Sequence, residues 1–354
     1  MINQNLNRKT DIENSKNKQA YGLASRRFHV ANNSHTKFDL GSVSKLFMSV
    51  AIAQLAQKNK ISLSDKAVKY VPKWLPQKQA KSITIQNLLN HTSGLTNFMS
   101  DKRFKLGGDS GLFVKVDDYK PIIRSEKLAF KPGTSQMYSN VGYIVLGAII
   151  EKVTGQDYFD YIRDHVFKPA HMKQAGFYRK DKPIKNLAIG YVPKQQGSHI
   201  KWRNNLFSSM FKGSPAGGAY ASSLDLYHFA QALLNHDLVS KAYTNRLLGT
   251  TIQKPNDQDA VHVGHKLSHG IQYKGLFTQH GFAGAWNEFG FAVWHHPPRV
   301  GHTGGLGGVD DYIAIFPKSH YVIIVLSNTT NRAKLHILST ISSLLGYQFR
   351  NFNL

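Results

Sequence analysis

Two residues able to perform acyl transfer lie three positions apart at the start of an apolar run. In the segment FDLGSVSKLFMSVAIAQLAQ, Ser42 precedes Lys45. Residues at this spacing share a helix face, so the amine can reach the hydroxyl. A serine becomes a nucleophile when a nearby base takes its proton, and lysine is a base only if it is held neutral. The alternative is a helix cap followed by a surface lysine. Ser44 is a second hydroxyl, but it lies on a different helix face.

A second candidate group precedes an apolar stretch in KPGTSQMYSNVGY. The Tyr138 phenol could relay protons, and the Asn140 amide could hold a substrate amide. The structural alternative is a tyrosine packed where a helix begins, with Asn140 as the N-cap.

A third candidate group lies in VGHTGGLGGVDDYIAIFP, where His302, Thr303, Gly304 and Gly305 are predicted at the start of a strand. Glycines there let a substrate backbone approach the strand edge. The N–H of Gly305 could join that of Ser42 in an oxyanion hole, which stabilises the negative charge of an acyl-transfer intermediate. The alternative is a glycine-rich hairpin turn.

The elements that must position these groups follow from hydrophobic periodicity and turn signals. A short strand is predicted within residues 18–30. Helices are predicted over residues 42–58, 84–94, 140–155, 158–169, 222–236 and 331–347. Strands are predicted over residues 270–277, 286–296, 309–317 and 320–328.

This order predicts an α+β fold in which a helical middle is inserted between an N-terminal strand and a C-terminal antiparallel sheet. Both ends of the chain are expected to meet in one sheet. The predicted organisation is a polar tail over residues 1–19 and a single catalytic domain over 20–354. Within that domain, residues 20–60 and 270–354 form the α/β part and residues 61–269 the helical part.

The composition narrows the function classes. The 354 residues are 41% hydrophobic, enough for a packed core, and include no cysteine, which excludes disulfides and thiolate chemistry. No apolar run is long enough to span a membrane, and the first 19 residues lack a signal core, so the chain as written is not expected to be exported.

The formal charge of +24 favours anionic partners, but no nucleic-acid-binding motif accompanies it. His262, His265 and His269 lack a neighbouring carboxylate, so no metal is expected.

The order and spacing of the three motifs resemble the serine β-lactamase and penicillin-binding-protein superfamily. The match is to its class C β-lactamase and D-alanyl-D-alanine carboxypeptidase branch. There the motifs are serine-x-x-lysine, tyrosine-x-asparagine, and lysine- or histidine-threonine-glycine. The segments TIQNLLNHTSGL, FKPGTSQMYSNVGYIVLGAIIEKVTG and GSPAGGAYASSLDLYHFAQALL are similar to the same branch. The resemblance covers most of residues 20–330.

The resemblance implies a transpeptidase-like fold: an antiparallel sheet flanked by helices, an all-helical subdomain, and a site between them. It implies that Ser42 is acylated, that Lys45 accepts its proton, and that Tyr138 assists proton transfer in both half-reactions. The backbone amides of Ser42 and Gly305 would form the oxyanion hole, with no cofactor. The implied substrate-binding residues are Asn140, His302, Thr303, Gly304 and Gly305.

Two departures from the family pattern matter. Fewer residues precede Ser42 than the family's N-terminal helix and strand require. We therefore expect either that the sheet lacks an edge or that the gene start is truncated. His302 stands where true β-lactamases and carboxypeptidases have lysine. Histidine is mostly neutral at pH 7, which favours esters or less anionic acyl donors over penicillins and D-alanyl peptides.

We therefore expect a serine hydrolase that acts through an acyl-enzyme on esters or small amides. The specific substrate we expect is a D-amino-acid ester or peptide of the cell envelope. The alternatives are a class C-like β-lactamase and a non-catalytic β-lactam-binding or scaffolding protein. The expected partners are a small-molecule or cell-wall-derived acyl substrate and an anionic polymer such as a teichoic acid. Family analogy favours the cell envelope, and no oligomeric state is indicated.

Overall fold

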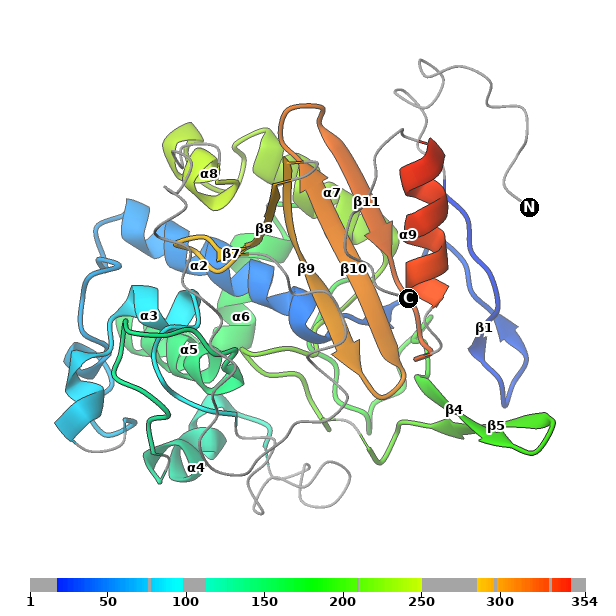
Figure 1. Cartoon of the computed structure of the whole chain (residues 1–354), viewed down its shortest axis with the longest axis horizontal. Helices are drawn as coiled ribbons and strands as arrows, with labels where there is room; N and C mark the ends of the chain where they lie inside the picture. The colour runs from blue at the N-terminus through cyan, green and yellow to red at the C-terminus, as the bar shows by residue number, and fades with distance from the viewer. Residues whose placement is uncertain are drawn as a thin grey trace.

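The computed structural model describes residues 18–75, 78–97, 113–125, 127–208, 210–249, 285–295, 298–330 and 333–344 (Figure 1). The α-helices are α2 (Lys45–Gln57), α3 (Ile85–Leu89), α4 (Lys120–Arg124), α5 (Asn140–Thr154), α6 (Tyr158–Ile162), α7 (Ser223–Leu234), α8 (Lys241–Leu247) and α9 (Ala333–Leu344). The shorter helical turns are η1 (Gly41–Ser44), η2 (Ala67–Lys69), η3 (Lys78–Ser82), η6 (Val116–Tyr119) and η7 (Arg163–Phe167). The strands are β1 (Leu23–Ser25), β2 (Val30–Ala31), β3 (Phe38–Asp39), β4 (Tyr191–Gln196), β5 (His199–Asn204), β6 (Tyr220–Ala221), β7 (Ala285–Trp286), β8 (Ala292–His295), β9 (Pro298–Leu306), β10 (Val309–Phe316) and β11 (Tyr321–Val325).

The largest sheet is antiparallel and has the strand order β11-β10-β9-β8-β7. Strand β10 is buried along its whole length because both faces of the sheet are covered. On one face Tyr312, Ala314 and Phe316 pack against α9, whereas Ile313 and Ile315 point into the main core on the other. This two-sided burial explains why the segment VDDYIAIFP is predicted correctly as a strand.

Helix α2 lies at the centre of the molecule and packs against β9 (Figure 1). Every residue from Lys45 to Ala56 is buried, as expected for a helix that is apolar on all sides. Phe47 makes edge-on ring contacts with Phe167 and Phe229 at centroid distances of 5.0 Å. The predicted helix over 42–58 is confirmed, except that its first residues form the tighter turn η1.

The predicted helix ends are largely confirmed. Thr84 and Asn87 form a capping box at α3, and Ser222 and Asp225 form one at α7. Gly155 ends α5 in the left-handed conformation, with φ of 72°.

Two helix ends differ from the predictions. Helix α3 stops at Leu89 rather than near residue 94, because His91 adopts a left-handed conformation with φ of 63°. The N-cap of α5 is Ser139, whose Oγ accepts from the Gly142 N–H at 3.1 Å. The alternative that made Asn140 the N-cap was therefore wrong.

The prediction that both ends of the chain meet in one sheet was also wrong for the described residues. Strand β1 has three residues with a register irregularity, too short and irregular for a ladder, and it pairs only with β2. Its link to the region after β11 is a side chain: Asn328 Nδ2 donates to the Leu23 and Ile189 carbonyl oxygens, at 3.0 and 2.8 Å.

The middle of the chain is not all-helical. It includes the β4–β5 hairpin, turned at Gly197 and Ser198, and β6, which pairs with β3. The sequence HIKWRN at β5 alternates in the strand pattern, a signal that the helical interpretation missed. The predicted strand over 270–277 and the histidines at 262, 265 and 269 lie outside the described residues.

Candidate active site

Ser42 lies in η1, in a turn fixed on several sides. Gly41 has a φ of 47°, and its N–H donates to Asp39 Oδ1 at 2.9 Å. Its carbonyl accepts from the Gly218 N–H at 3.1 Å and from Ser44 Oγ at 2.8 Å. Ser42 is partly exposed amid buried neighbours, whereas Ser44 is buried and has a structural role. The turn therefore presents only the first of the two hydroxyls.

Lys45 is the first residue of α2 and is completely buried. Its Nζ lies 3.1 Å from Ser42 Oγ and 2.8 Å from Asn140 Oδ1, and it also contacts the Ala216 carbonyl oxygen. No carboxylate in the described parts of the chain forms an ion pair with it. Burial holds the pKa of Lys45 well below its ordinary value.

The three contacts of Lys45 suit a neutral amine. A neutral amine has two N–H donors and one lone pair. The two donors are matched by Asn140 Oδ1 and the Ala216 carbonyl, neither of which can donate in return. The lone pair is then left for the Ser42 O–H. In this arrangement Lys45 can accept the serine proton.

Tyr138 completes the contacts of the serine oxygen. Its O–H donates to Ser42 Oγ at 2.7 Å. Burial raises the pKa of Tyr138 far above its ordinary value, so the phenol stays protonated and acts as a donor. Of the two groups that contact Ser42 Oγ, only Lys45 can therefore serve as the base.

His91 supports the ring of Tyr138. The two ring centroids are 4.5 Å apart, and the backbone N–H of Ser139 donates to His91 Nδ1 at 3.2 Å. The imidazole is fully buried, and burial, followed by the nearby Lys45 and His302, lowers its pKa well below the ordinary value. The sequence did not mark His91 as a site residue, because ring stacking between distant segments leaves no local signal.

Asn140 is the first residue of α5, and this position places its side chain in the site. Its Oδ1 accepts from Lys45, and its Nδ2 donates to Asn97 Oδ1 at 3.3 Å. The side chain therefore orients the amine of Lys45, in addition to the substrate contact that the family pattern implies. Asn97 and the carbonyl of Ala216 were not predicted from the sequence.

The predicted strand residues line the far side of the nucleophile turn, at the end of β9 rather than its start. Strand β8 pairs with β9 only as far as Gly301, so no described strand covers that edge from His302 onward. A side chain at Gly304 would overlap the Leu40 carbonyl, and a Cβ on Gly41 would lie 3.2 Å from the backbone nitrogen of Gly305. Gly305 is exposed, so its backbone is accessible beside Ser42.

His302 and Thr303 are both buried in this strand. The ring centroid of His302 lies 6.3 Å from that of Tyr138, and its Nδ1 lies 2.6 Å from the Thr303 carbonyl oxygen. Burial and the neighbouring Lys45 lower the pKa of His302 to about 3. The histidine is therefore neutral at physiological pH and offers no permanent cation to a substrate carboxylate.

The structure thus brings Ser42, Lys45, Tyr138 and Asn140 into direct contact and sets the end of β9 beside them. A comparison with protein families matches residues 12–343 to the family described as "Beta-lactamase". The chain belongs to the beta-lactamase family. This is a family of serine hydrolases, and the predicted superfamily and α+β transpeptidase-like fold are confirmed.

Curated relatives and a solved structure agree with the beta-lactamase assignment. The chain is 28% identical over 317 residues to the putative penicillin-binding protein PbpX of Bacillus subtilis, covering 90% of this chain and 68% of that protein. It is 31% identical over 303 residues to protein flp of Staphylococcus aureus, covering 83% of this chain and 53% of flp. It therefore spans about half of flp. A penicillin binding protein from Bacillus halodurans superposes with a TM-score of 0.73 at 25% identity, covering 91% and 90% of the two chains.

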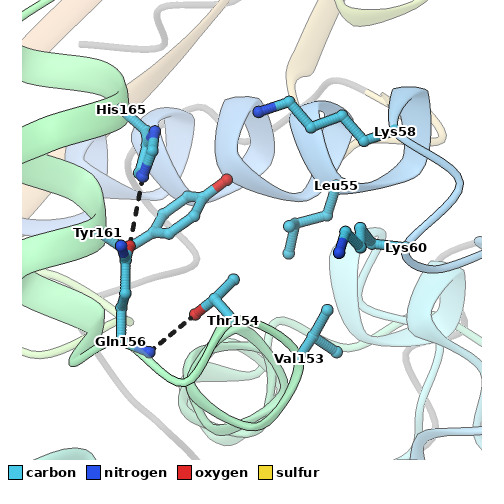
Figure 2. A pocket seen from close by; sticks show the side chains of 8 residues that line it. All are labelled: Leu55, Lys58, Lys60, Val153, Thr154, Gln156, Tyr161 and His165. Carbon is cyan, nitrogen blue, oxygen red and sulfur yellow. Dashed lines mark hydrogen bonds between the residues drawn. The ribbon is translucent and has the colours of Figure 1, made fainter.

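One cavity of this beta-lactamase family member lies apart from the Ser42 region. A cavity of about 200 Å³ opens where α2 and α5 end, and none of the predicted site residues lines it (Figure 2). Its lining residues are Leu55, Lys58, Lys60, Val153, Thr154, Gln156, Tyr161 and His165. In the described ranges no cluster of three or more metal-ligating side chains is found, and no helix is long and apolar enough to cross a membrane.

Proposed function

We propose that this protein hydrolyses an acyl compound through a covalent intermediate on Ser42, with Lys45 as the general base. The observation that carries the proposal is the buried amine beside the serine oxygen, with its two N–H donors already matched. A base in this state can take the serine proton without first releasing a proton of its own.

The proposed reaction has two halves. Ser42 Oγ attacks the acyl carbon while its proton passes to Lys45. The oxyanion is held by the backbone N–H groups of Ser42 and Gly305. The bond to the alcohol or amine then breaks, and the leaving group takes a proton from Lys45 through Tyr138. In the second half, water gives its proton to the same pair and attacks the acyl-enzyme, and the Ser42 oxygen leaves with a proton.

The substrate class we propose is an ester or small amide. Within that class, the specific substrate we propose is a D-amino-acid ester or peptide of the cell envelope. The support is the buried, neutral His302, which provides no cation where a substrate carboxylate would be bound. We expect His302→Lys to raise kcat/KM for acyl donors that carry a carboxylate, relative to uncharged esters. An unchanged ratio, in a variant that folds, would remove this support.

The acyl-enzyme is tested by intact mass spectrometry after incubation with an activated ester and, separately, with a penicillin. We expect one acyl adduct, or steady product release, in the wild type and in Ser64→Ala, and neither in Ser42→Ala. Ser64→Ala is the matched control because it removes an exposed hydroxyl that contacts Ser62 and not the nucleophile turn. If the wild type and Ser42→Ala behave alike, the proposed catalysis is wrong and the non-catalytic binding or scaffolding function replaces it.

The second candidate function is reaction with β-lactams, supported by the names of the penicillin-binding relatives. The same mass experiment separates the outcomes. A stable penicillin adduct indicates a penicillin-binding protein, whereas rapid turnover of penicillins or cephalosporins indicates a class C-like β-lactamase. If the penicillin gives neither a stable adduct nor turnover while the ester is hydrolysed, the esterase function is supported.

A further inference from the structure

Two β-hairpins far apart in the sequence lie side by side at one end of the molecule (Figure 1). The guanidinium of Arg26, between β1 and β2, stacks on the Trp202 ring of β5 at 3.7 Å. The backbone N–H of Arg26 also donates to the Tyr191 hydroxyl of β4 at 2.8 Å. We call this surface, formed by residues 21–31 and 191–207, the hairpin face.

The hairpin face concentrates the exposed apolar side chains of the structure. Seven large hydrophobic side chains are exposed in the described residues, and all but Ile337 lie on it. Phe207 is 77% exposed and Phe28 is 68% exposed, while Ile200 is 53% exposed. Such a concentration is typical of an interaction site, because single exposed hydrophobics are normally scattered.

The charge of the hairpin face has a single sign. The sequence contains no aspartate or glutamate between residues 14 and 38 or between 182 and 224. Lys194 and Lys201 are directly opposite each other in the β4–β5 ladder, a like-charge pair that destabilises a hairpin. Among the described ion pairs none involves either lysine. A negatively charged partner would relieve this repulsion.

We propose that the hairpin face docks onto an anionic membrane surface. The Arg27 guanidinium lies 5.4 Å from the centre of the exposed Phe28 ring. Apolar and basic side chains on the same segments match the two layers of such a surface, in which acyl chains lie beneath anionic headgroups. A soluble polyanion would be attracted by the lysines alone and would leave Phe28 and Phe207 in water. The charge and the apolar side chains together therefore favour a lipid surface, and the inference does not depend on the chemistry at Ser42.

The test is sedimentation of the full chain with vesicles of phosphatidylcholine alone or with phosphatidylglycerol added. We expect binding only to the anionic vesicles, weakening as salt is raised. Lys194→Gln/Lys201→Gln should lower the partition coefficient roughly 25-fold, since each surface cation contributes about fivefold. Phe28→Ser/Phe207→Ser should lower it at least tenfold with the net charge unchanged.

The matched control is Lys58→Gln/Lys60→Gln, which removes the same charge from the cavity where α2 ends, away from the hairpin face. We expect it to bind within about threefold of the wild type, since distant charges are screened. Thermal unfolding verifies that each variant is folded. Absence of binding to anionic vesicles, or equal losses in the two lysine variants, would overturn the proposal. Full competition by soluble polyphosphate, with the phenylalanine variant binding normally, would assign the face to a polyanion instead.

Discussion

The Tyr138 hydroxyl lies 2.7 Å from Ser42 Oγ, although the two residues are 96 positions apart in the chain. Because burial raises the pKa of the phenol, this contact supplies a proton donor and no second base. The serine therefore has one group that can remove its proton and one that can return a proton, and the two are different residues.

Replacing Lys45 tests which form of the amine is required. Lys45→Arg places a permanent cation at this position and cannot supply a neutral base, because guanidinium does not deprotonate in proteins. We expect the kcat/KM of this variant to fall by a factor of about 10²–10⁴, as for loss of a general base. The kcat/KM of Lys45→Met should fall by a similar factor. If the arginine variant kept most of the activity, Lys45 would act as a cation. Hydrolysis of an activated ester, with circular dichroism as a folding control, provides the measurement.

The rate of acylation should rise with pH through the pKa of Lys45. Burial lowers that pKa, so the neutral, active form is populated at lower pH than for an ordinary lysine. A titration near pH 6.5 from His302 is not expected, because its pKa is about 3. Stopped-flow acylation from pH 4 to 10 measures the profile. An inflection near 6.5 that disappears in His302→Asn would contradict this assignment.

Removing only the hydroxyl of Tyr138 should separate proton transfer from packing. Tyr138→Phe keeps the ring that stacks on His91 and loses the donor to Ser42 Oγ. We expect kcat to fall about 10²-fold, with little change in melting temperature. The loss should be smaller for esters with good leaving groups, which need no proton. An equal loss for all leaving groups would argue for a purely structural hydroxyl.

His91 should act through the position of Tyr138. His91→Asn retains a residue that tolerates positive φ and an acceptor near the Ser139 N–H, but removes the stacked ring. We expect kcat to fall about tenfold with KM nearly constant. Once Tyr138→Phe is present, adding His91→Asn should have little further effect. Additive losses in this double-mutant cycle would mean that the histidine acts independently.

Acid should destabilise the fold through His302. Its pKa is about 3 when folded, below the ordinary value of 6.5, so the unfolded chain binds more protons between these pH values. Stability is therefore full above pH 6.5 and falls as pH drops toward 3, by up to about 1.4 kcal/mol per pH unit. His302→Asn should reduce this slope without abolishing it, because burial also holds the pKa of His91 below its ordinary value. Urea unfolding at pH 7, 5.5 and 4.5 measures it, and parallel slopes in both proteins would refute the prediction.

Features that depend on neighbouring residues could be predicted from the sequence. The spacing of Ser42 and Lys45 on one helical turn, the capping box at Thr84 and the glycine end of α5 all follow from local chemistry. The order of the three motifs then identified the superfamily and the candidate residues. The pairing of Tyr138 and Asn140 with the nucleophile turn came from that resemblance.

Features that depend on tertiary contacts could not be predicted. The Ala216 carbonyl that orients Lys45 has no side-chain signature, and His91 stacks on a ring that lies 47 positions away (138 − 91). The N-terminal strand was predicted in the main sheet, but its length and irregular register limit it to pairing with β2. The β4–β5 hairpin, by contrast, has a local signal in the alternation of HIKWRN, which the helical interpretation of this region missed.

The three oxygen atoms that contact Lys45 Nζ belong to residues 3, 95 and 171 positions away in the chain. Only the first contact can form in an isolated helix, and the other two require long loops to close during folding. A refolding molecule in which α2 has formed before these loops close would carry a protonated lysine beside Ser42, because its amine would still be exposed to water. Recovery of hydrolysis should then follow the slowest refolding phase, whereas helical signal returns earlier. Activity in this protein thus reports complete assembly of the native chain.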